Sequence, residues 1–168
     1  KKVLFSTKHR HIECEQVIAT EHPYVINNDA SNEIQNLPSW IIDWLKEALT
    51  EGFDLKDNNF PKKIYIDRYD ASPNIKKYKK IINEEAVVNA TKNAGYKNII
   101  LSNFSLINQK KYFFNAQKII GLHGAAFANI VFSKKNTKIL EIQSTGTGDV
   151  IKNLAIKSDL IYDNITIK

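Results

Sequence analysis

The sequence is poor in several residue types, and each shortage narrows the class of protein. Its 168 residues include no methionine, one cysteine, four prolines and six glycines. Because Cys14 has no partner in the chain, a disulfide-stapled scaffold is excluded, and a lone thiol fits a reducing, cytoplasmic compartment. Since even an initiator methionine is missing, we expect the chain to be a processed or excised piece of a longer protein.

Long apolar runs are missing as well. No stretch approaches the ~20 consecutive apolar residues that a membrane-spanning helix requires. The first residues do not follow the pattern of a signal peptide. We therefore expect a cytoplasmic protein, with peripheral attachment to the inner face of a membrane as the alternative.

Arginine is scarce although the chain is basic. The net charge is +6 at pH 7, and Arg10 and Arg68 are the only arginines among the 24 basic residues. A basic surface favours anionic partners such as a nucleotide, an acidic glycan or an anionic lipid. The chain has no arginine-rich stripe and no aromatic stacking motif of the known nucleic-acid readers, so we expect no nucleic-acid partner.

What remains is the composition of one soluble domain, with 43% hydrophobic and 25% charged residues. From residue 62 onward, strand-like apolar runs alternate with helical patterns. This alternation predicts an α/β fold with a Rossmann-like parallel sheet and helices on both faces. We expect residues 61–168 to form this lobe, and residues 1–60 to be a connecting segment, the whole being one compact unit.

The pattern also predicts individual elements. Apolar runs predict strands over residues 62–67, 97–101, 118–122, 138–142 and 160–162, and helical spacing predicts helices over residues 38–50, 84–94, 105–116 and 149–158. In the first helix we expect Trp44 in the core, and Trp40 in a packing role rather than at a sugar site. His9, His11 and Glu13 lack the ligand spacing of a known metal site, so we expect no metal there.

The clearest unit runs from Lys118 to Gln143. It begins with Lys118–Leu122, an apolar run typical of a buried parallel strand, which stops at His123-Gly124-Ala125. A short helix with its apolar residues on one side follows, and then a second apolar strand that carries Glu141. The order is strand, glycine turn, helix and strand.

This unit has the properties of an anion site. A helix N-terminus carries unpaired N–H groups and partial positive charge, which attract phosphate, and Gly124 lets the backbone approach it. His123 lies at the strand end where open α/β sheets bind ligands, so its ring could donate to phosphate or act on a proton. Glu141 could accept hydrogen bonds from a ribose diol. Taken singly, these are a local cap, a turn residue and a solvated strand end, so the pattern counts only as a set.

The same residues resemble a known family signature. His123-Gly124-Ala125-Ala126 with Asn129 and Phe132, followed by Ile139-Leu140-Glu141-Ile142, resembles glycosyltransferase family 61, the capsular-polysaccharide type. Further segments match in the same order: Ile64–Arg68, Asn83–Glu85, Ser105–Leu106, Gln109, Phe113–Ala116, Leu154–Ala155 and Tyr162. The resemblance covers about Lys62 to Asp163, and weakly the stretch before it.

The resemblance implies an inverting glycosyltransferase of the two-lobed GT-B type in bacterial surface polysaccharide synthesis. The C-terminal Rossmann-like lobe of such an enzyme binds the nucleotide sugar, and this chain corresponds to that half. The implied partners are a nucleotide sugar as substrate, expected to be UDP-linked, and a glycan or lipid-linked glycan acceptor. No cofactor and no metal are implied. With the other lobe absent, we expect the fragment to bind nucleotide but to be inactive alone.

The resemblance also assigns basic residues to the donor diphosphate. Arg68 matches the first of two arginines that the family places there. The second falls at Lys79 or Lys80, where this sequence departs from the family pattern. Lysine neutralises phosphate as a point charge rather than as a two-pronged donor, which puts affinity and donor choice in question.

The remaining implied roles belong to the central unit. His123, the catalytic candidate, faces the diphosphate and the developing charge of the leaving group together with Gly124 and Ala125. Asn129 either braces the turn or reaches the ligand, and Glu141 holds the ribose.

Two questions stay open at this stage. The general base is Asp67, Asp70 or His123, or it comes from the missing acceptor lobe. The alternative functions are a noncatalytic nucleotide- or glycan-binding module, and a structural α/β domain of the flavodoxin or receiver kind. A receiver would need a phosphorylatable aspartate at the end of its central strand, where this chain has His123.

Overall fold

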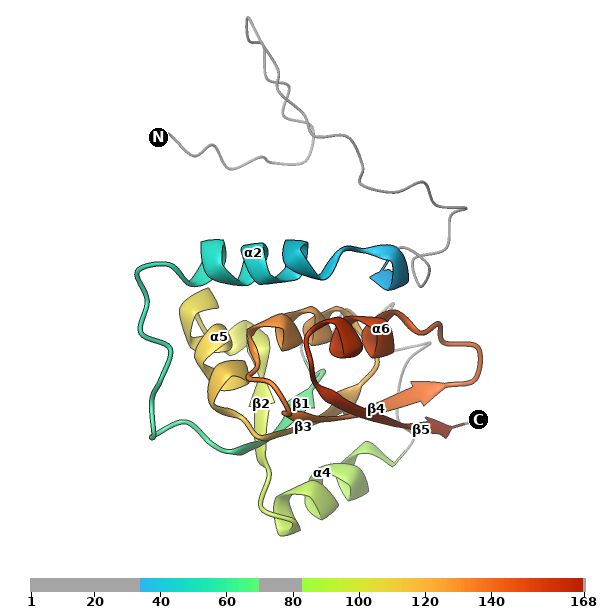
Figure 1. The fold of residues 1–168 in the computed structure, drawn as a ribbon. Coiled ribbons are helices and arrows are strands. Elements are labelled where there is room, and N and C mark those ends of the chain that lie inside the picture. Colours follow the sequence, from blue (N-terminus) through green and yellow to red (C-terminus); the bar gives the residue numbers. More distant parts are fainter. Residues whose placement is uncertain (1–33, 70–82, 168) are drawn as a thin grey trace, which may run out of the picture.

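The computed structural model describes residues 34–69 and 83–167, and it contains a five-stranded, all-parallel sheet in the order β2-β1-β3-β4-β5 (Figure 1). The strands are β1 Lys63–Asp67, β2 Lys97–Ile100, β3 Lys118–Leu122, β4 Lys138–Ser144 and β5 Ile161–Ile167. The expected α/β, Rossmann-like fold is therefore confirmed.

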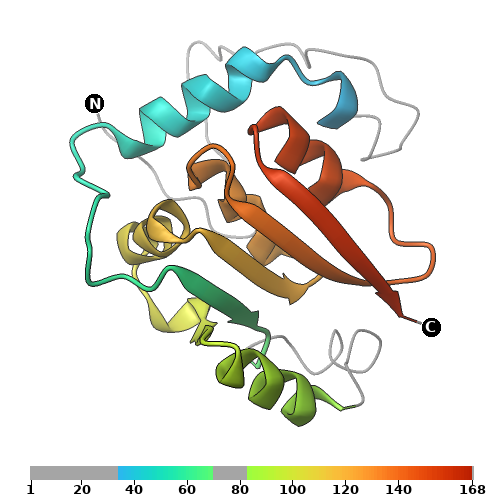
Figure 2. The same cartoon turned by 60° about the horizontal axis from the view of Figure 1, so that its bottom comes forward.

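Helices lie on both faces of this sheet. They are α2 Ser39–Thr50, α4 Glu84–Asn93, α5 Leu106–Asn115 and α6 Val150–Lys157, with the 3₁₀ helices η1 Leu101–Asn103 and η2 Ala125–Phe132. One face is covered by α5, η2 and α6, and the other carries α4 (Figures 1 and 2). Helix α2 lies across the outside of the first group (Figure 1).

The strand order creates a switch point between β1 and β3. From β1 the chain first adds β2 on one side, and then returns to add β3 on the other side. In open doubly wound sheets of this order, ligands bind outside the carboxyl ends of the two strands that flank the switch. Those ends are Asp67 and Leu122 here, so the residues that follow them are the first to consider as a site.

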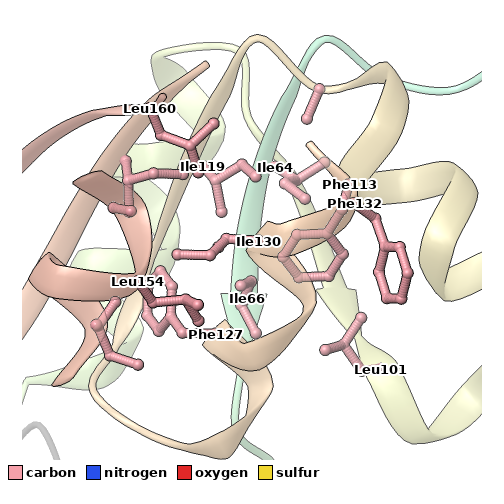
Figure 3. Packing of buried hydrophobic residues seen from close by; sticks show 14 of the residues in the cluster. Ile64, Ile66, Leu101, Phe113, Ile119, Phe127, Ile130, Phe132, Leu154 and Leu160 are labelled. Atoms are coloured by element: carbon pink, nitrogen blue, oxygen red, sulfur yellow. The ribbon is translucent and has the colours of Figure 1, made fainter. Parts of the chain in front are cut away.

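The core lies between the sheet and the helices of the first group. Ile64, Ile119 and Ile139 form a cross-strand row and are almost completely buried. Phe127 and Ile130, three residues apart in η2, pack on this side of the sheet with no exposed surface (Figure 3). Three residues make one turn of a 3₁₀ helix, so Phe127 and Ile130 lie on the same side of η2. The turn before η2 is thus attached to a rigid core.

Helix α2 corrects two expectations about packing. Its inward residue is Ile42, which is 3% exposed, and Lys46 Nζ donates to the Ser133 carbonyl at 2.8 Å. Trp44 and Trp40 are 58% and 64% exposed, so the prediction that Trp44 lies in the core was wrong, as was the packing role for Trp40. Ile42 and Trp44 are two residues apart and so about 200° apart around the helix, which lets only one of them face inward.

Element boundaries differ most at the end of the chain. The last strand was expected over residues 160–162, but β5 extends to Ile167 because all seven of its residues pair with β4. Because it contains polar residues such as Asp163 and Asn164, an apolar-run criterion did not predict its full length.

The expected lobe begins at residue 61, but Leu55, which precedes it, is 5% exposed and therefore buried. The boundary between the connecting segment and the lobe stays a prediction.

Candidate functional site

Arg68 and His123 meet at the switch point. Arg68 follows β1 and His123 follows β3, and Arg68 Nη1 donates to the His123 carbonyl oxygen at 2.6 Å. The guanidinium also lies against Gly124, where an added Cβ would be 2.9 Å from Nη1 and 3.0 Å from Cζ. The missing side chain of Gly124 therefore makes room for Arg68.

His123 is also the first member of a chain of three side chains from adjacent strands. Its Nδ1 lies 2.5 Å from Oε1 of Glu141 in β4. The hydroxyl of Tyr162 in β5 donates to Oε2 of the same carboxylate, also at 2.5 Å. Glu141 is 1% exposed, whereas the His123 side chain is 21% exposed. The chain thus runs from a buried carboxyl group to a ring that reaches the surface.

Strand register explains why these three side chains meet. Gly121 pairs with Glu141, and the His123 amide donates to the Ile142 carbonyl at 2.8 Å, which carries the pairing past the end of β3. Alternate residues share a face, so His123 lies on the same face as Gly121 and Glu141. Tyr162 pairs with Ile139, two residues before Glu141, and reaches the carboxylate along the diagonal.

The Tyr162 phenol is a neutral donor in this arrangement. Burial is the largest influence that raises its pKa, and the hydrogen bond to Glu141 and the charge of Glu141 raise it further. A side-chain hydrogen bond with Asn164 acts in the opposite direction, and the charge of Asp149 adds a small increase. Tyr162 therefore keeps its proton at neutral pH and donates it in the hydrogen bond to Glu141.

These contacts tie Glu141 to other protein side chains, and the ribose-binding role that we expected for it stays a prediction. Both of its carboxylate oxygens are already hydrogen-bonded to protein side chains. A buried charge requires such partners, because each unpaired group would carry a large desolvation penalty. Glu141 consequently acts on His123, and leaves Nε2 as the ring nitrogen available to a ligand.

The start of η2 supplies backbone donors beside this ring. The first hydrogen bond of η2 joins the Phe127 amide to the Gly124 carbonyl at 3.0 Å, so the amide groups of Ala125 and Ala126 precede it. Ala125 is exposed. Asn129 Nδ2 donates to the Ala126 carbonyl at 3.2 Å, which is the bracing contact among the two expected alternatives.

The other candidates fall in different places. Lys79, Lys80 and Asp70 lie outside the described residues. Asp67 accepts hydrogen bonds from the Tyr69 amide through Oδ1 and from Asn98 Nδ2 through Oδ2, both at 2.8 Å. Both of its oxygens therefore hold the strand end and its loop. Of the described candidates for a general base, only His123 keeps an atom, Nε2, that makes no hydrogen bond within the described residues.

Two structural features are absent from residues 34–69 and 83–167. In this part of the chain no group of three or more His, Cys, Asp and Glu side chains is placed to bind a metal ion. Over the same residues, none of the helices has both the length and the apolar character to cross a membrane.

Sequence reasoning missed the contact between Tyr162 and Glu141. Tyr162 was noted as part of the family resemblance, but nothing linked it to the site. The link depends on β5 lying next to β4 and on the parity of their pairing. The signal that could have found it was an aromatic hydroxyl at the start of a strand directly after the strand that carries Glu141.

The fold and the site together define a class: a doubly wound α/β domain with basic and imidazole groups at its switch point. The chain also matches the sequence model of the family Glycosyltransferase 61 over residues 4–140. It therefore belongs to glycosyltransferase family 61. No curated protein matches the chain significantly. The flavodoxin-like strand order alone would also suit the structural alternative, but the family match favours a glycosyltransferase.

The matched range locates the site only in part. It includes Arg68 and His123, and it ends one residue before Glu141. It also begins well before Lys62, in the stretch where we noted only a weak resemblance. The contacts of Glu141 and Tyr162 are thus a property of the structure that the family match does not supply.

Proposed function

We propose that this chain is the donor-binding lobe of an inverting, two-lobed GT-B glycosyltransferase that acts in bacterial surface polysaccharide synthesis. Its donor is a nucleotide sugar, UDP-linked by preference, and its acceptor is a glycan or a lipid-linked glycan. Membership of the family supports the reaction class. The observation that carries the donor site is the meeting of Arg68 and His123 at the switch point.

The site offers three kinds of group to a diphosphate. Arg68 brings a fixed positive charge, the amide of Ala125 brings a backbone donor at the start of η2, and His123 brings Nε2. In the reaction the acceptor hydroxyl gives its proton to a general base while its oxygen bonds to the anomeric carbon. The bond from that carbon to the phosphate oxygen breaks, and its electron pair goes to the diphosphate. Donors that face this growing negative charge lower the barrier.

The protein groups also suggest how the charge is balanced. Arg68, together with Lys79 or Lys80, neutralises part of the diphosphate charge. We therefore expect the complete enzyme to need no divalent cation. Transfer by the complete enzyme should persist in excess chelator, and an absolute requirement for a divalent ion would contradict this expectation.

Calorimetric titration of the chain with UDP, GDP and CMP tests the donor site. We expect one nucleotide to bind selectively, and Arg68→Ala and His123→Ala to lose about tenfold or more in affinity, the range of one charge-assisted hydrogen bond. Lys97→Ala is the matched control, because it removes an exposed positive charge from the opposite, amino end of β2. Equal losses in the control, or no binding of any nucleotide by the folded chain, would contradict the donor site.

A noncatalytic nucleotide- or glycan-binding module remains the second candidate. The observation in its favour is the lysine at the position of the family's second arginine. This candidate would use the same site, so nucleotide titration does not separate the two. Tight nucleotide binding by the complete protein without sugar transfer to any acceptor would favour the binding module.

A further inference from the structure

The contacts of His123 determine which of its nitrogens carries hydrogen. An ionised carboxylate only accepts hydrogen bonds, so both protons that face Glu141 come from its partners. One comes from the Tyr162 hydroxyl, and the other from Nδ1 of His123. Neutral His123 then has its hydrogen on Nδ1 and a lone pair on Nε2.

A lone pair on Nε2 cannot donate to a phosphate oxygen. We infer that Tyr162 and Glu141 are positioning residues that hold His123 in this tautomer, so that Nε2 takes up a proton when a nucleoside diphosphate binds. The inference rests on the proposed donor site. The proton comes from solvent and goes to Nε2, and no bond of the nucleotide changes in this step.

The charges around the ring make this uptake favourable. Glu141 contacts Nδ1 directly, and its carboxylate stabilises an imidazolium. Arg68 contacts the His123 carbonyl and acts against a second positive charge. Tyr162 is neutral, and Asp149 lies close enough to influence it. A bound phosphate adds negative charge on the Nε2 side, which shifts this balance towards the protonated ring.

The inference predicts how affinity depends on pH. The complex holds the proton on Nε2 more tightly than the free protein does. Over the pH range in which binding is accompanied by this uptake, affinity should fall by up to about tenfold for each unit of rising pH. At most about one proton is taken up for each nucleotide bound.

Nuclear magnetic resonance of the histidine ring nitrogens tests the tautomer without any nucleotide. The signal of His123, one of four histidines, is assigned by its loss in His123→Asn. We expect the neutral ring of the wild type to carry hydrogen on Nδ1. A wild-type ring with hydrogen on Nε2 would overturn the inference outright.

Glu141→Gln makes this test sharper. Tyr162 would donate to the new amide oxygen, so the amide nitrogen would face Nδ1 and donate to it, and the hydrogen should move to Nε2. Adding Tyr162→Phe removes the hydroxyl that orients the amide, so the double variant should show a mixture of both tautomers. Tyr112→Phe is the control, since it removes a phenol hydroxyl from α5, away from the site, and should leave the tautomer unchanged. An unchanged tautomer in Glu141→Gln would also count against the inference.

Calorimetry in two buffers of different ionisation enthalpy measures the proton uptake. The ligand is whichever of UDP, GDP and CMP binds, and His123→Asn gives the correction for protons taken up by the nucleotide itself. We expect uptake by the wild type, and binding without uptake by Glu141→Gln, whose Nε2 already carries hydrogen. Nucleotide binding without uptake by the wild type would overturn this inference alone. Failure of all three nucleotides to bind would overturn the donor site as well.

Discussion

Gly124 shows how a single missing side chain can decide the position of a charge. A Cβ at this position would lie within 3.3 Å of three atoms of the Arg68 guanidinium. The group that must move is the far end of a flexible side chain, so the protein can adapt by releasing Arg68 from the His123 carbonyl. We therefore expect Gly124 to matter more for the proposed nucleotide binding than for folding.

We expect Gly124→Ala to lower nucleotide affinity about tenfold while costing about 1 kcal/mol of stability, the worth of one partly exposed hydrogen bond. Calorimetric titration and urea unfolding measure the two quantities. In an Arg68→Ala background the same substitution should have no further effect on affinity, because the group that it displaces is absent. Additive losses would show that Gly124 acts through something other than Arg68.

Gly121 provides the comparison for this substitution. Its added Cβ would lie 3.1 Å from Cβ of Ile66 and 3.2 Å from the Phe127 ring, inside the core. Neither neighbour can swing away, so Gly121→Ala should cost about 1–3 kcal/mol of unfolding free energy. Gly121→Ala should therefore cost more stability than Gly124→Ala, whereas Gly124→Ala should cost more nucleotide affinity.

At the residue scale the sequence predicted which residues gather but not all of their contacts. The strand-end positions of Arg68 and His123 follow from the apolar runs before them, because carboxyl ends of parallel strands share one edge. The ribose role of Glu141 rested on analogy with dinucleotide folds. The sequence places Glu141 on a strand but does not say which residue of the next strand lies beside it.

Among the elements, α2 is attached to the lobe through its C-terminal end. Lys110 of α5 is 5% exposed, and its Nζ donates to the Leu49 carbonyl at 2.5 Å. The same ammonium lies 5.8 Å from the Phe53 ring centroid and 5.4 Å from that of Phe132. A cation at a helix C-terminus is stabilised by the helix dipole and by the unpaired carbonyls there.

Lys110→Met should loosen α2 without unfolding the sheet. The methionine keeps most of the packing but leaves the Leu49 carbonyl without its donor, which costs about 1–3 kcal/mol. Hydrogen exchange should therefore speed up in residues 39–50 more than in β1 or β3.

The neighbouring lysine gives the control. Lys111 Nζ lies 3.6 Å from Asp57, and both side chains are 26% exposed, so Lys111→Met should change stability by less than about 1 kcal/mol. Exchange that accelerates equally in α2 and in the sheet would mean that α2 is not a separate unit of stability.

The ends of helices were predictable where a characteristic residue type marks them. Gly95 has a φ of 82°, as expected of a glycine that ends a helix, and Ser105 accepts from the Asn108 amide at the start of α5. Asn83 is the N-cap residue of α4, but its side chain makes no capping hydrogen bond there. The length of β5 could not be predicted, since an edge strand need not be apolar to pair.

For the whole molecule, the alternation of strands and helices was enough to predict the class of fold, and strand order was not. Alternation favours parallel pairing, because each crossover helix returns the chain to the same edge. The position of β1 between β2 and β3 depends on which side each crossover takes. That choice is decided by packing between helices distant in sequence, which a single sequence does not reveal.

The global stability should depend at alkaline pH on two tyrosines, the buried Tyr65 and the partly buried Tyr162. Burial, followed by the charges of Glu84 and Asp67, raises the pKa of Tyr65 to about 12, and burial also raises the pKa of Tyr162. An unfolded tyrosine has a pKa of about 10, so below that pH both states are protonated and these groups contribute a constant stability. Above pH 10 the unfolded state loses its protons first, and stability falls by about 1.4 kcal/mol per pH unit for each tyrosine.

Urea unfolding of Tyr65→Phe, Tyr162→Phe and the double variant between pH 8 and 11.5 measures this dependence. Phenylalanine cannot lose a proton, so each single variant should decline less steeply than the wild type above pH 10, and the double variant least steeply. Below pH 9 all four curves should run parallel, because neither tyrosine titrates there in either state. Lysines also titrate in the alkaline range, but they are common to all four proteins and cancel in the comparison. If the four curves stay parallel up to pH 11.5, the folded state does not raise the pKa of either phenol. The hydrogen bond from Tyr162 to Glu141 would then not hold the phenol proton more tightly than water does.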